Sequence, residues 1–274
     1  MESCFFLHNP KAGGTAIREQ LAQRFGPAET APILDLVPDV YRRNPPPALP
    51  PGYRYYAGHY GYDHYRALGV AHPLITNFRH PAPRILSLYN YFRYSVAETA
   101  EVREAPEYHA VRLARSAGFD DFVASDDPRV ATYVQDYHFR QLAGSGWSLE
   151  ADASIAEVCE LIDRLDWYYV CEHPLLSVLW GREALGIPSL AIPRANVTPG
   201  GGDLTAGLLG LSEASLSTLM KRNRRDLKIY AHALSRFFRV TADLMLRPRE
   251  DEAGASAPHA SGSPPGWPGL AVAA

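Results

Sequence analysis

The fold of this chain is decided by the stretch CFFLHNPKAGGTA, residues 4–16. Its first four residues are all apolar, as in a strand buried on both faces, and we predict a strand over Ser3–His8. Two adjacent glycines then allow the backbone to turn tightly. A helix is predicted over residues 15–24, because apolar side chains recur there every four positions. A strand, a glycine turn and a helix in this order are typical of an α/β fold.

The same alternation continues along the chain. Further strands are predicted at residues 53–58, 74–78 and 167–171. Helices are predicted from about residue 83 and over residues 154–165, 174–185, 212–222 and 223–246, with an irregular helical region at 95–150. Strands that alternate with helices predict an α/β fold with a mainly parallel, P-loop-like sheet flanked by helices. In such sheets, ligands bind beyond the carboxyl ends of the strands.

Length and composition narrow the class of protein. The 274 residues suit one domain, predicted at residues 1–247, and the Ala-, Gly-, Ser- and Pro-rich residues 248–274 are expected to be disordered. The net charge of −3 argues against a nucleic-acid binder. Three cysteines without a C-x-x-C pair do not indicate a disulfide framework. No apolar run reaches the roughly 18 residues of a membrane span, so a cytoplasmic protein is expected.

The loop at residues 8–16 has the properties of an anion site. Its glycines let successive backbone N–H groups point inward, and the start of a helix adds unpaired N–H groups and a positive dipole end. The lysine of this loop supplies a point charge, and the threonine supplies a hydroxyl donor. The candidate binding residues are Lys11, Ala12, Gly13, Gly14, Thr15 and Ala16.

The order of these residues differs from that of a standard P-loop. A P-loop places its lysine after the glycines, whereas Lys11 precedes them. No predicted strand clearly ends in an aspartate that could hold Mg²⁺. A P-loop-type nucleotide kinase or phosphotransferase is therefore less favoured, and it stays open as the main alternative.

A second motif follows the third predicted strand. The strand ends at Arg79, whose planar guanidinium can bind a phosphate through two N–H groups. Ser87, eight residues later, can add a hydroxyl donor. Arg84 is read equally well as a phosphate ligand or as a structural ion-pair residue. Together, the two motifs suit a ligand with phosphate groups at both ends.

The two motifs resemble those of the carbohydrate-type sulfotransferases, the family that contains the heparan 2-O-sulfating enzymes. Residues 8–15 are similar to its H-I-P-K-T-G-G-T loop, and residues 79–89 to its R-D-P-x-x-R-x-x-S-x-Y motif. The chain departs from the family at Asn9, Ala12 and His80. The resemblance implies that 3′-phosphoadenosine-5′-phosphosulfate (PAPS) is the donor, that Arg79 and Ser87 hold its 3′-phosphate, that adenosine 3′,5′-bisphosphate (PAP) is the product, and that no metal is needed.

A catalytic base is expected between the two motifs. The segment GHYGY, residues 58–62, resembles the family's G-H-x-x-x segment, whose histidine serves as the base, and His59 takes that position. A histidine can accept a proton near neutral pH, and His64 is the weaker competitor. Lys11 would stabilise the leaving phosphate oxygen. The candidate residues for binding the acceptor are Tyr60, Tyr62, His64 and Arg140, although the tyrosines could equally be strand packing.

Three later segments extend the resemblance. Residues 136–144, which include Arg140, are similar to the family's N-Y-Q-T-R-x-L-x-G, and residues 223–230 to its N-x-x-D-x-x-x-Y helix. Asn196 and Thr198 match a late N-x-[ST] segment that closes over the donor. The implied function is transfer of a sulfuryl group from PAPS to a hydroxyl of a sugar, lipid or small molecule. A catalytically inactive nucleotide-binding module is a further alternative, and the oligomeric state stays open.

Overall fold

The computed structural model describes residues 1–32, 48–146, 148–192 and 210–247. The predicted tail at 248–274 and the glycine-rich segment that carries Asn196 and Thr198 lie outside the described residues.

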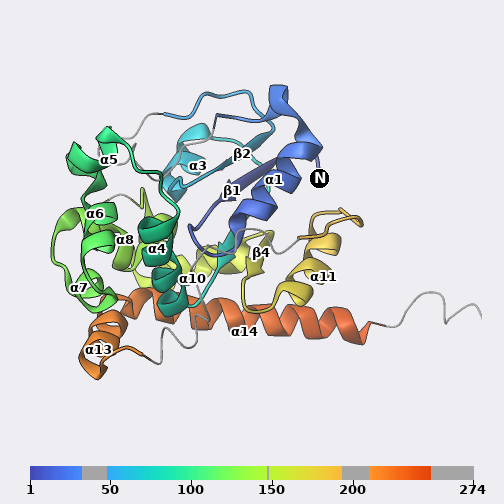
Figure 1. The fold of residues 1–274 in the computed structure, drawn as a ribbon. Coiled ribbons are helices and arrows are strands. Elements are labelled where there is room, and N and C mark those ends of the chain that lie inside the picture. Colours follow the sequence, from blue (N-terminus) through green and yellow to red (C-terminus); the bar gives the residue numbers. More distant parts are fainter. Residues whose placement is uncertain (33–47, 147, 193–209, 248–274) are drawn as a thin grey trace, which may run out of the picture.

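The centre of the molecule is a four-stranded, fully parallel sheet (Figure 1). Its strands are β1 (Cys4–Leu7), β2 (Tyr55–Gly58), β3 (Leu74–Phe78) and β4 (Trp167–Val170), in the order β2-β1-β3-β4. All four strands are buried along their length. The predicted α/β class and parallel sheet are thus confirmed. Because β1 lies between β2 and β3, the loop that follows β1 emerges between two other strand ends.

Helices cover both faces of the sheet. On one face lie α1 (Gly14–Phe25) and α11 (Pro174–Ala184). On the other face lie α3 (Tyr62–Leu68), α9 (Tyr137–Ala143), α10 (Ile155–Arg164) and the long α14 (Arg224–Leu246). Two neighbouring residues of β4 bond to helices on opposite faces of the sheet. Trp167 Nε1 donates to the Ser177 carbonyl of α11, and the Tyr168 hydroxyl donates to the Ala233 carbonyl of α14.

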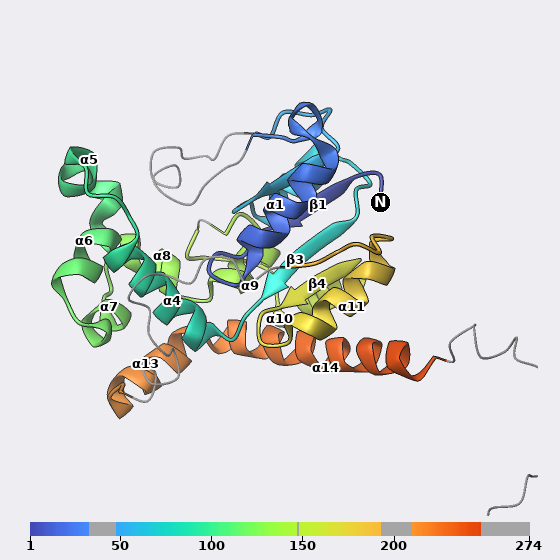
Figure 2. The same ribbon diagram turned by 45° about the vertical axis from the view of Figure 1, so that its right-hand side comes forward.

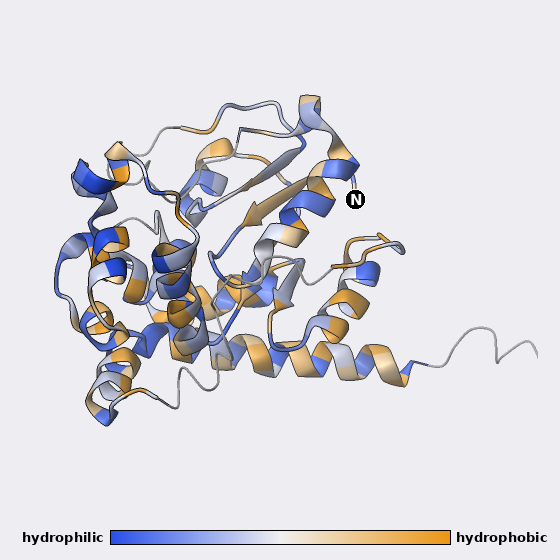
Figure 3. Ribbon diagram, viewed as in Figure 1, coloured by the Kyte–Doolittle hydropathy of each residue, from blue (hydrophilic) through white to orange (hydrophobic). Residues whose placement is uncertain are grey.

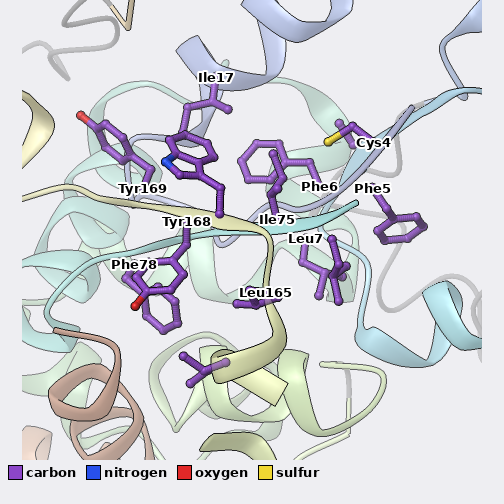
Figure 4. Close-up of a cluster of buried hydrophobic side chains, with 14 of the residues drawn as sticks. Cys4, Phe5, Phe6, Leu7, Ile17, Ile75, Phe78, Leu165, Tyr168 and Tyr169 are labelled. Atoms are coloured by element: carbon purple, nitrogen blue, oxygen red, sulfur yellow. The ribbon is translucent and has the colours of Figure 1, made fainter. Parts of the chain in front are cut away.

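The main core fills the space between the sheet and these helices. Figure 4 shows Phe6 beside Ile17 of α1 on one side of the sheet, with Phe78, Tyr168 and Leu165 on the other. Adjacent strand residues point to opposite faces, so a strand covered on both faces must be apolar throughout. Helix α14 differs from the strands: in Figure 3 it carries both hydrophobic and hydrophilic residues along its whole length.

A second core lies beside the sheet in a group of shorter helices (Figure 2). The group comprises α4 (Pro81–Tyr94), α5 (Ala100–Glu104), α6 (His109–Ser116), α7 (Phe119–Ala124), α8 (Pro128–Val134) and α13 (Glu213–Arg222). A 3-10 turn at Pro106–Tyr108 joins α5 to α6 within the group, and another at Pro27–Glu29 follows α1. The apolar side of α4, which includes Ile85 and Phe92, packs inside this group. In the described part of the chain, no helix is both long and apolar enough to cross a membrane.

Two helices differ from the prediction. The short helix α3 was not predicted, because its sequence YDHYRAL lacks a clear apolar repeat. Helix α4 begins at Pro81 rather than near Pro83, because the His80 side chain caps it by accepting the Ala82 N–H at 3.3 Å. Proline suits the first turn of a helix, where its missing N–H needs no partner. Ser87 therefore lies in the second turn of α4.

Candidate functional site

The ends of three neighbouring strands bring the sequence motifs together. His59 follows β2, the loop at residues 8–13 follows β1, and Arg79 follows β3. Arg79 Nη1 donates a hydrogen bond of 2.8 Å to the carbonyl oxygen of Lys11. The arginine of the second motif therefore touches the lysine of the first, although 68 positions separate them in sequence.

The loop after β1 is held in shape by Asn77 of β3. The Asn77 side chain accepts the Asn9 N–H at 2.8 Å and donates to the carbonyls of Asn9 and Ala12, each at 2.9 Å. Within this loop Lys11 has φ of 63° and Gly13 has φ of 80°, both in the left-handed region. A non-glycine residue held there costs of order 1–3 kcal/mol. The buried Asn77 amide offsets that cost and fixes the loop without any ligand.

The two loop glycines allow a close approach that no other residue permits. A Cβ at Gly13 would lie 2.9 Å from Cε1 of Tyr169 on β4, and its positive φ would strain a side chain as well. A Cβ at Gly14 would overlap the ring of His8 and lie 3.0 Å from Nδ2 of Asn77. Both glycines are therefore required by the packing of the loop.

The first turn of α1 is open to an anion. The helix begins at Gly14 after Gly13, and neither a capping side chain nor an acidic residue occupies its first turn. The N–H groups at the start of a helix lack partners within it, and the dipole there favours negative charge. Thr15 is partly exposed at this position, whereas Ala12 and Ala16 are buried. The loop can thus offer backbone donors and the Thr15 hydroxyl to a phosphate-type group.

Lys11 is poised between charged and neutral forms. Burial, and then the neighbouring charge of Arg79, lower its pKa to about 8. Its Nζ lies 4.4 Å from the centre of the Tyr91 ring on α4, a cation–π contact. Two cations that lie close together repel each other, so an anion bound beside them would stabilise both.

His59 lies against His8 rather than alone. The centres of the two rings are 4.8 Å apart, and the Nδ1 atoms of both rings are buried without a hydrogen-bond partner. Burial, and then the charge of Arg18, lower the pKa of His59 to about 3. Burial, followed by the charges of His59, Arg18 and Lys11, holds the pKa of His8 well below its usual value. Both imidazoles are therefore neutral near pH 7, and each has a lone pair that can accept a proton.

Two buried amides that the sequence reasoning missed complete this polar cluster. Gln141 of α9 donates from Nε2 to the carbonyls of Tyr60 at 2.8 Å and His8 at 3.2 Å, which joins the ends of β1 and β2. Its Oε1 has no partner, nor has either side-chain atom of Asn9, and both residues are fully buried. An unsatisfied buried polar atom costs about 1–3 kcal/mol, so such a group favours a bound water or ligand atom. A sequence signal exists for Asn77, an amide inside the buried strand β3, whereas Asn9 lies in a loop and Gln141 in a helix that also contains His138 and Arg140.

Of the predicted acceptor residues, Tyr60 and His64 lie inside the protein. Tyr60 is fully buried, and its hydroxyl donates to the Pro32 carbonyl at 2.8 Å. The His64 ring is buried 5.7 Å from the Tyr60 ring. Tyr62 is partly exposed at the start of α3, and its ring stacks on the ring of Tyr65, with the two ring centres 5.8 Å apart. Tyr60 therefore packs the core, the alternative that the sequence left open for the tyrosines.

Arg140 lies in a buried, structural environment. Its side chain is 1% exposed and donates to the backbone carbonyls of Thr132, Gln135, Gly146 and Ser148, at 2.5–2.9 Å. A guanidinium with its donors committed in this way fixes the turn after α9. These contacts favour a structural role for Arg140, and its predicted contact with the acceptor stays a prediction.

Arg84 and Ser87 of the second motif, three residues apart on α4, differ in burial. Arg84 is 1% exposed, donates to the Tyr133 carbonyl at 3.1 Å, and has its pKa lowered by burial while the charge of Asp226 acts against that shift. The Nε and Nη1 atoms of Arg84 are buried without a hydrogen-bond partner, so both interpretations of this residue stay open. Ser87 is partly exposed in the second turn of α4.

Across the described ranges, no group of three or more His, Cys, Asp or Glu side chains is placed to hold a metal ion.

Comparisons with known proteins identified no relative. No family model matches this chain, and no curated protein matches it.

Proposed function

We propose that this chain is a sulfotransferase that moves a sulfuryl group from PAPS to a hydroxyl acceptor. The observation that carries the proposal is the hydrogen bond from Arg79 to the Lys11 carbonyl. It puts a permanently charged guanidinium beside an anion loop at the start of α1, so that one ligand with two separate phosphate groups can contact both. Such a ligand is what the two sequence motifs indicate.

Each residue at this edge has a role in the proposal. The backbone of residues 11–16 and the Thr15 hydroxyl bind the 5′-phosphosulfate, while Arg79 and Ser87 bind the 3′-phosphate. Lys11 stabilises the charge that develops on the leaving phosphate oxygen. Asn196 and Thr198 keep their proposed donor-binding roles on the basis of sequence alone.

The proposed reaction is an in-line displacement at sulfur. The acceptor oxygen forms a bond to sulfur, the bond from sulfur to the 5′-phosphate oxygen breaks, and His59 takes the hydroxyl proton. The products are a sulfate ester and PAP. The low pKa of His59 belongs to the protein without ligand, and a nearby bound anion raises the pKa of an imidazole. The donor thus makes His59 a better base once it is bound.

The proposal is tested by comparing the effects of two nucleotides on thermal stability. PAP should raise the melting temperature more than ATP with Mg²⁺, because at equal concentration the ligand that binds the native state more tightly stabilises it more. The variant Arg79→Ala should lose most of the PAP effect, and Arg66→Ala, an exposed arginine on α3, should keep it. Greater stabilisation by Mg²⁺-ATP would instead support the nucleotide kinase.

A second assay separates an enzyme from an inactive nucleotide-binding module. The protein is incubated with sulfur-labelled PAPS and a panel of sugar, lipid and phenolic alcohols, and transfer of label is measured. Transfer to any class supports the proposal and identifies the acceptor. Binding of PAP without transfer to any acceptor in the panel would favour the inactive module.

A further inference from the structure

A basic pocket lies where α13 ends and α14 begins, the orange elements at the lower left of Figures 1 and 2. The pocket has a volume of about 240 Å³. It is lined by Asp136, Ile155, Lys221, Arg224, Arg225 and Lys228. Most of the lining side chains are thus cations, in a chain whose net charge is −3.

The pocket is separate from the candidate site around Lys11. Arg224 and Lys228 lie on the exposed side of α14. Tyr230 lies on the buried side, where its ring is 5.5 Å from the ring of His80, next to Arg79. The body of α14 therefore stands between the basic pocket and the second motif.

The two arginines of this pocket are placed where they weaken the helix that carries them, whereas Lys221 lies in the last turn of α13, where positive charge is favourable. Arg224 and Arg225 occupy the first turn of α14, where the positive end of the helix dipole disfavours positive charge. Arg224 and Lys228 are four residues apart on the same helix, a spacing at which like charges repel. Helix stability thus gives no reason for this arrangement, whereas binding of an anion does.

One cation of the pocket is held rigidly in place. Arg225 Nε donates to Asp136 Oδ2 at 2.8 Å, and its guanidinium lies 4.6 Å from the centre of the Phe139 ring. Asp136 also accepts the N–H groups of Arg225 and Asp226, at 2.9 and 3.0 Å. The single carboxylate of the pocket is therefore already satisfied by Arg225 and two backbone donors.

The other three cations keep their charge available. Within the described residues, no ion pair joins Lys221, Arg224 or Lys228 to a carboxylate. The adjacent Arg222 is different, since it donates to the Ser125 carbonyl at 2.6 Å and pairs with Asp126 next to α7. The run of basic residues therefore contains one structural arginine and a separate set that faces the pocket.

We infer that this pocket binds a soluble ligand that carries two or more clustered phosphate or sulfate groups. Arg225 supplies a preorganised planar donor, and Lys221, Arg224 and Lys228 supply mobile charges around it. A single weak anion cannot satisfy several cations at once, whereas clustered charges can. The inference does not depend on the proposed sulfotransferase function.

Pyrophosphate is the probe for the experiment, which follows ¹⁵N-labelled full-length protein by NMR. The backbone amides of residues 221–228 should shift in a saturable way, and added salt should weaken the binding. The amides of residues 11–16 report separately on the loop after β1. A parallel titration with a disulfated disaccharide distinguishes the source of the charge: tighter binding of the disaccharide identifies a sulfated sugar, and tighter binding of pyrophosphate a phosphate ligand.

A double variant with a matched control assigns the binding to these side chains. Lys221→Gln together with Lys228→Gln changes two exposed residues, and it should weaken pyrophosphate binding at residues 221–228 about tenfold. Arg239→Gln removes an exposed charge further along α14 and should change the affinity less than about twofold. Equal weakening in both variants would overturn the inference, as would pyrophosphate shifts confined to residues 11–16.

Discussion

At the scale of single residues, the molecule depends on polar side chains with unusual surroundings. Lys11 has a left-handed backbone, a cation beside it, and a pKa of about 8. His59 and His8 are neutral imidazoles in contact, with unpartnered Nδ1 atoms. None of these features benefits stability, and all of them suit a bound anion and a proton transfer.

The charge of Lys11 should control the binding of PAP. Lys11→Ala should weaken PAP binding about 10- to 100-fold, the range for a lost charge-assisted hydrogen bond. In the wild type, PAP affinity should fall as pH rises through about 8, because Lys11 then loses its proton. Lys11→Arg stays charged and should show a flat profile between pH 7 and 9. Calorimetric titration at several pH values measures both effects, and an unchanged affinity in Lys11→Ala would remove this residue from the site.

The choice between His59 and His64 as the base can be made by substitution. His59→Ala should reduce turnover about 10²- to 10⁴-fold, the usual contribution of a general base. PAP binding should change little, because His59 acts on the acceptor. His64→Ala is the matched control, since that ring is buried, with its centre 5.7 Å from the centre of the Tyr60 ring. Loss of turnover in His64→Ala alone would transfer the role to His64.

At the scale of elements, the loop after β1 depends on its neighbour β3. Asn77 makes three hydrogen bonds to the loop backbone. In Asn77→Ala the Asn9 N–H and the carbonyls of Asn9 and Ala12 would be buried without partners. The free energy of unfolding should therefore fall by about 2–4 kcal/mol, and PAP affinity should fall with it.

Urea unfolding monitored by circular dichroism checks the effect of Asn77→Ala on stability. Asn90→Ala, on the partly exposed side of α4, is the matched control and should lower the stability by less than about 1 kcal/mol. Equal effects in the two variants would mean that Asn77 does not hold the loop.

At the scale of the whole molecule, buried histidines link folding to pH. His138 is 4% exposed, lies 3.2 Å from Thr76 Oγ1, and has its pKa lowered to about 3 by burial and then by Arg84. His8 is equally buried, with its pKa lowered as well. Below about pH 6.5 the unfolded chain takes up protons at these histidines that the folded protein does not. Their contribution to stability is therefore present above pH 6.5 and is lost on acidification.

One carboxyl group acts in the opposite direction. Burial raises the pKa of Asp226 to about 6, so the folded protein binds a proton there between about pH 6 and 4, which offsets one histidine. His59 contributes in the same way as His8 and His138, because its pKa is also lowered to about 3. With three histidines and one opposing carboxyl group, the net loss should be about 2.8 kcal/mol per pH unit between pH 6 and 4. His138→Gln should remove about half of this slope. Denaturant unfolding between pH 7.5 and 4.5 measures it, and identical slopes in wild type and variant would contradict the assignment.

Local sequence pattern was enough to predict the α/β class, the two motifs at strand ends, and the four strands of the described residues to within about two positions. It could do so because a strand buried on both faces must be continuously apolar, and a tight turn needs glycine, whatever surrounds them. The roles of individual polar side chains became clear only from their contacts in space. Arg140 and Tyr60 point into the protein and bond to backbone carbonyls, whereas Asn77 and Gln141 join strand ends that are far apart in sequence. Such contacts depend on which elements pack together in space, and the local sequence pattern does not predict this packing.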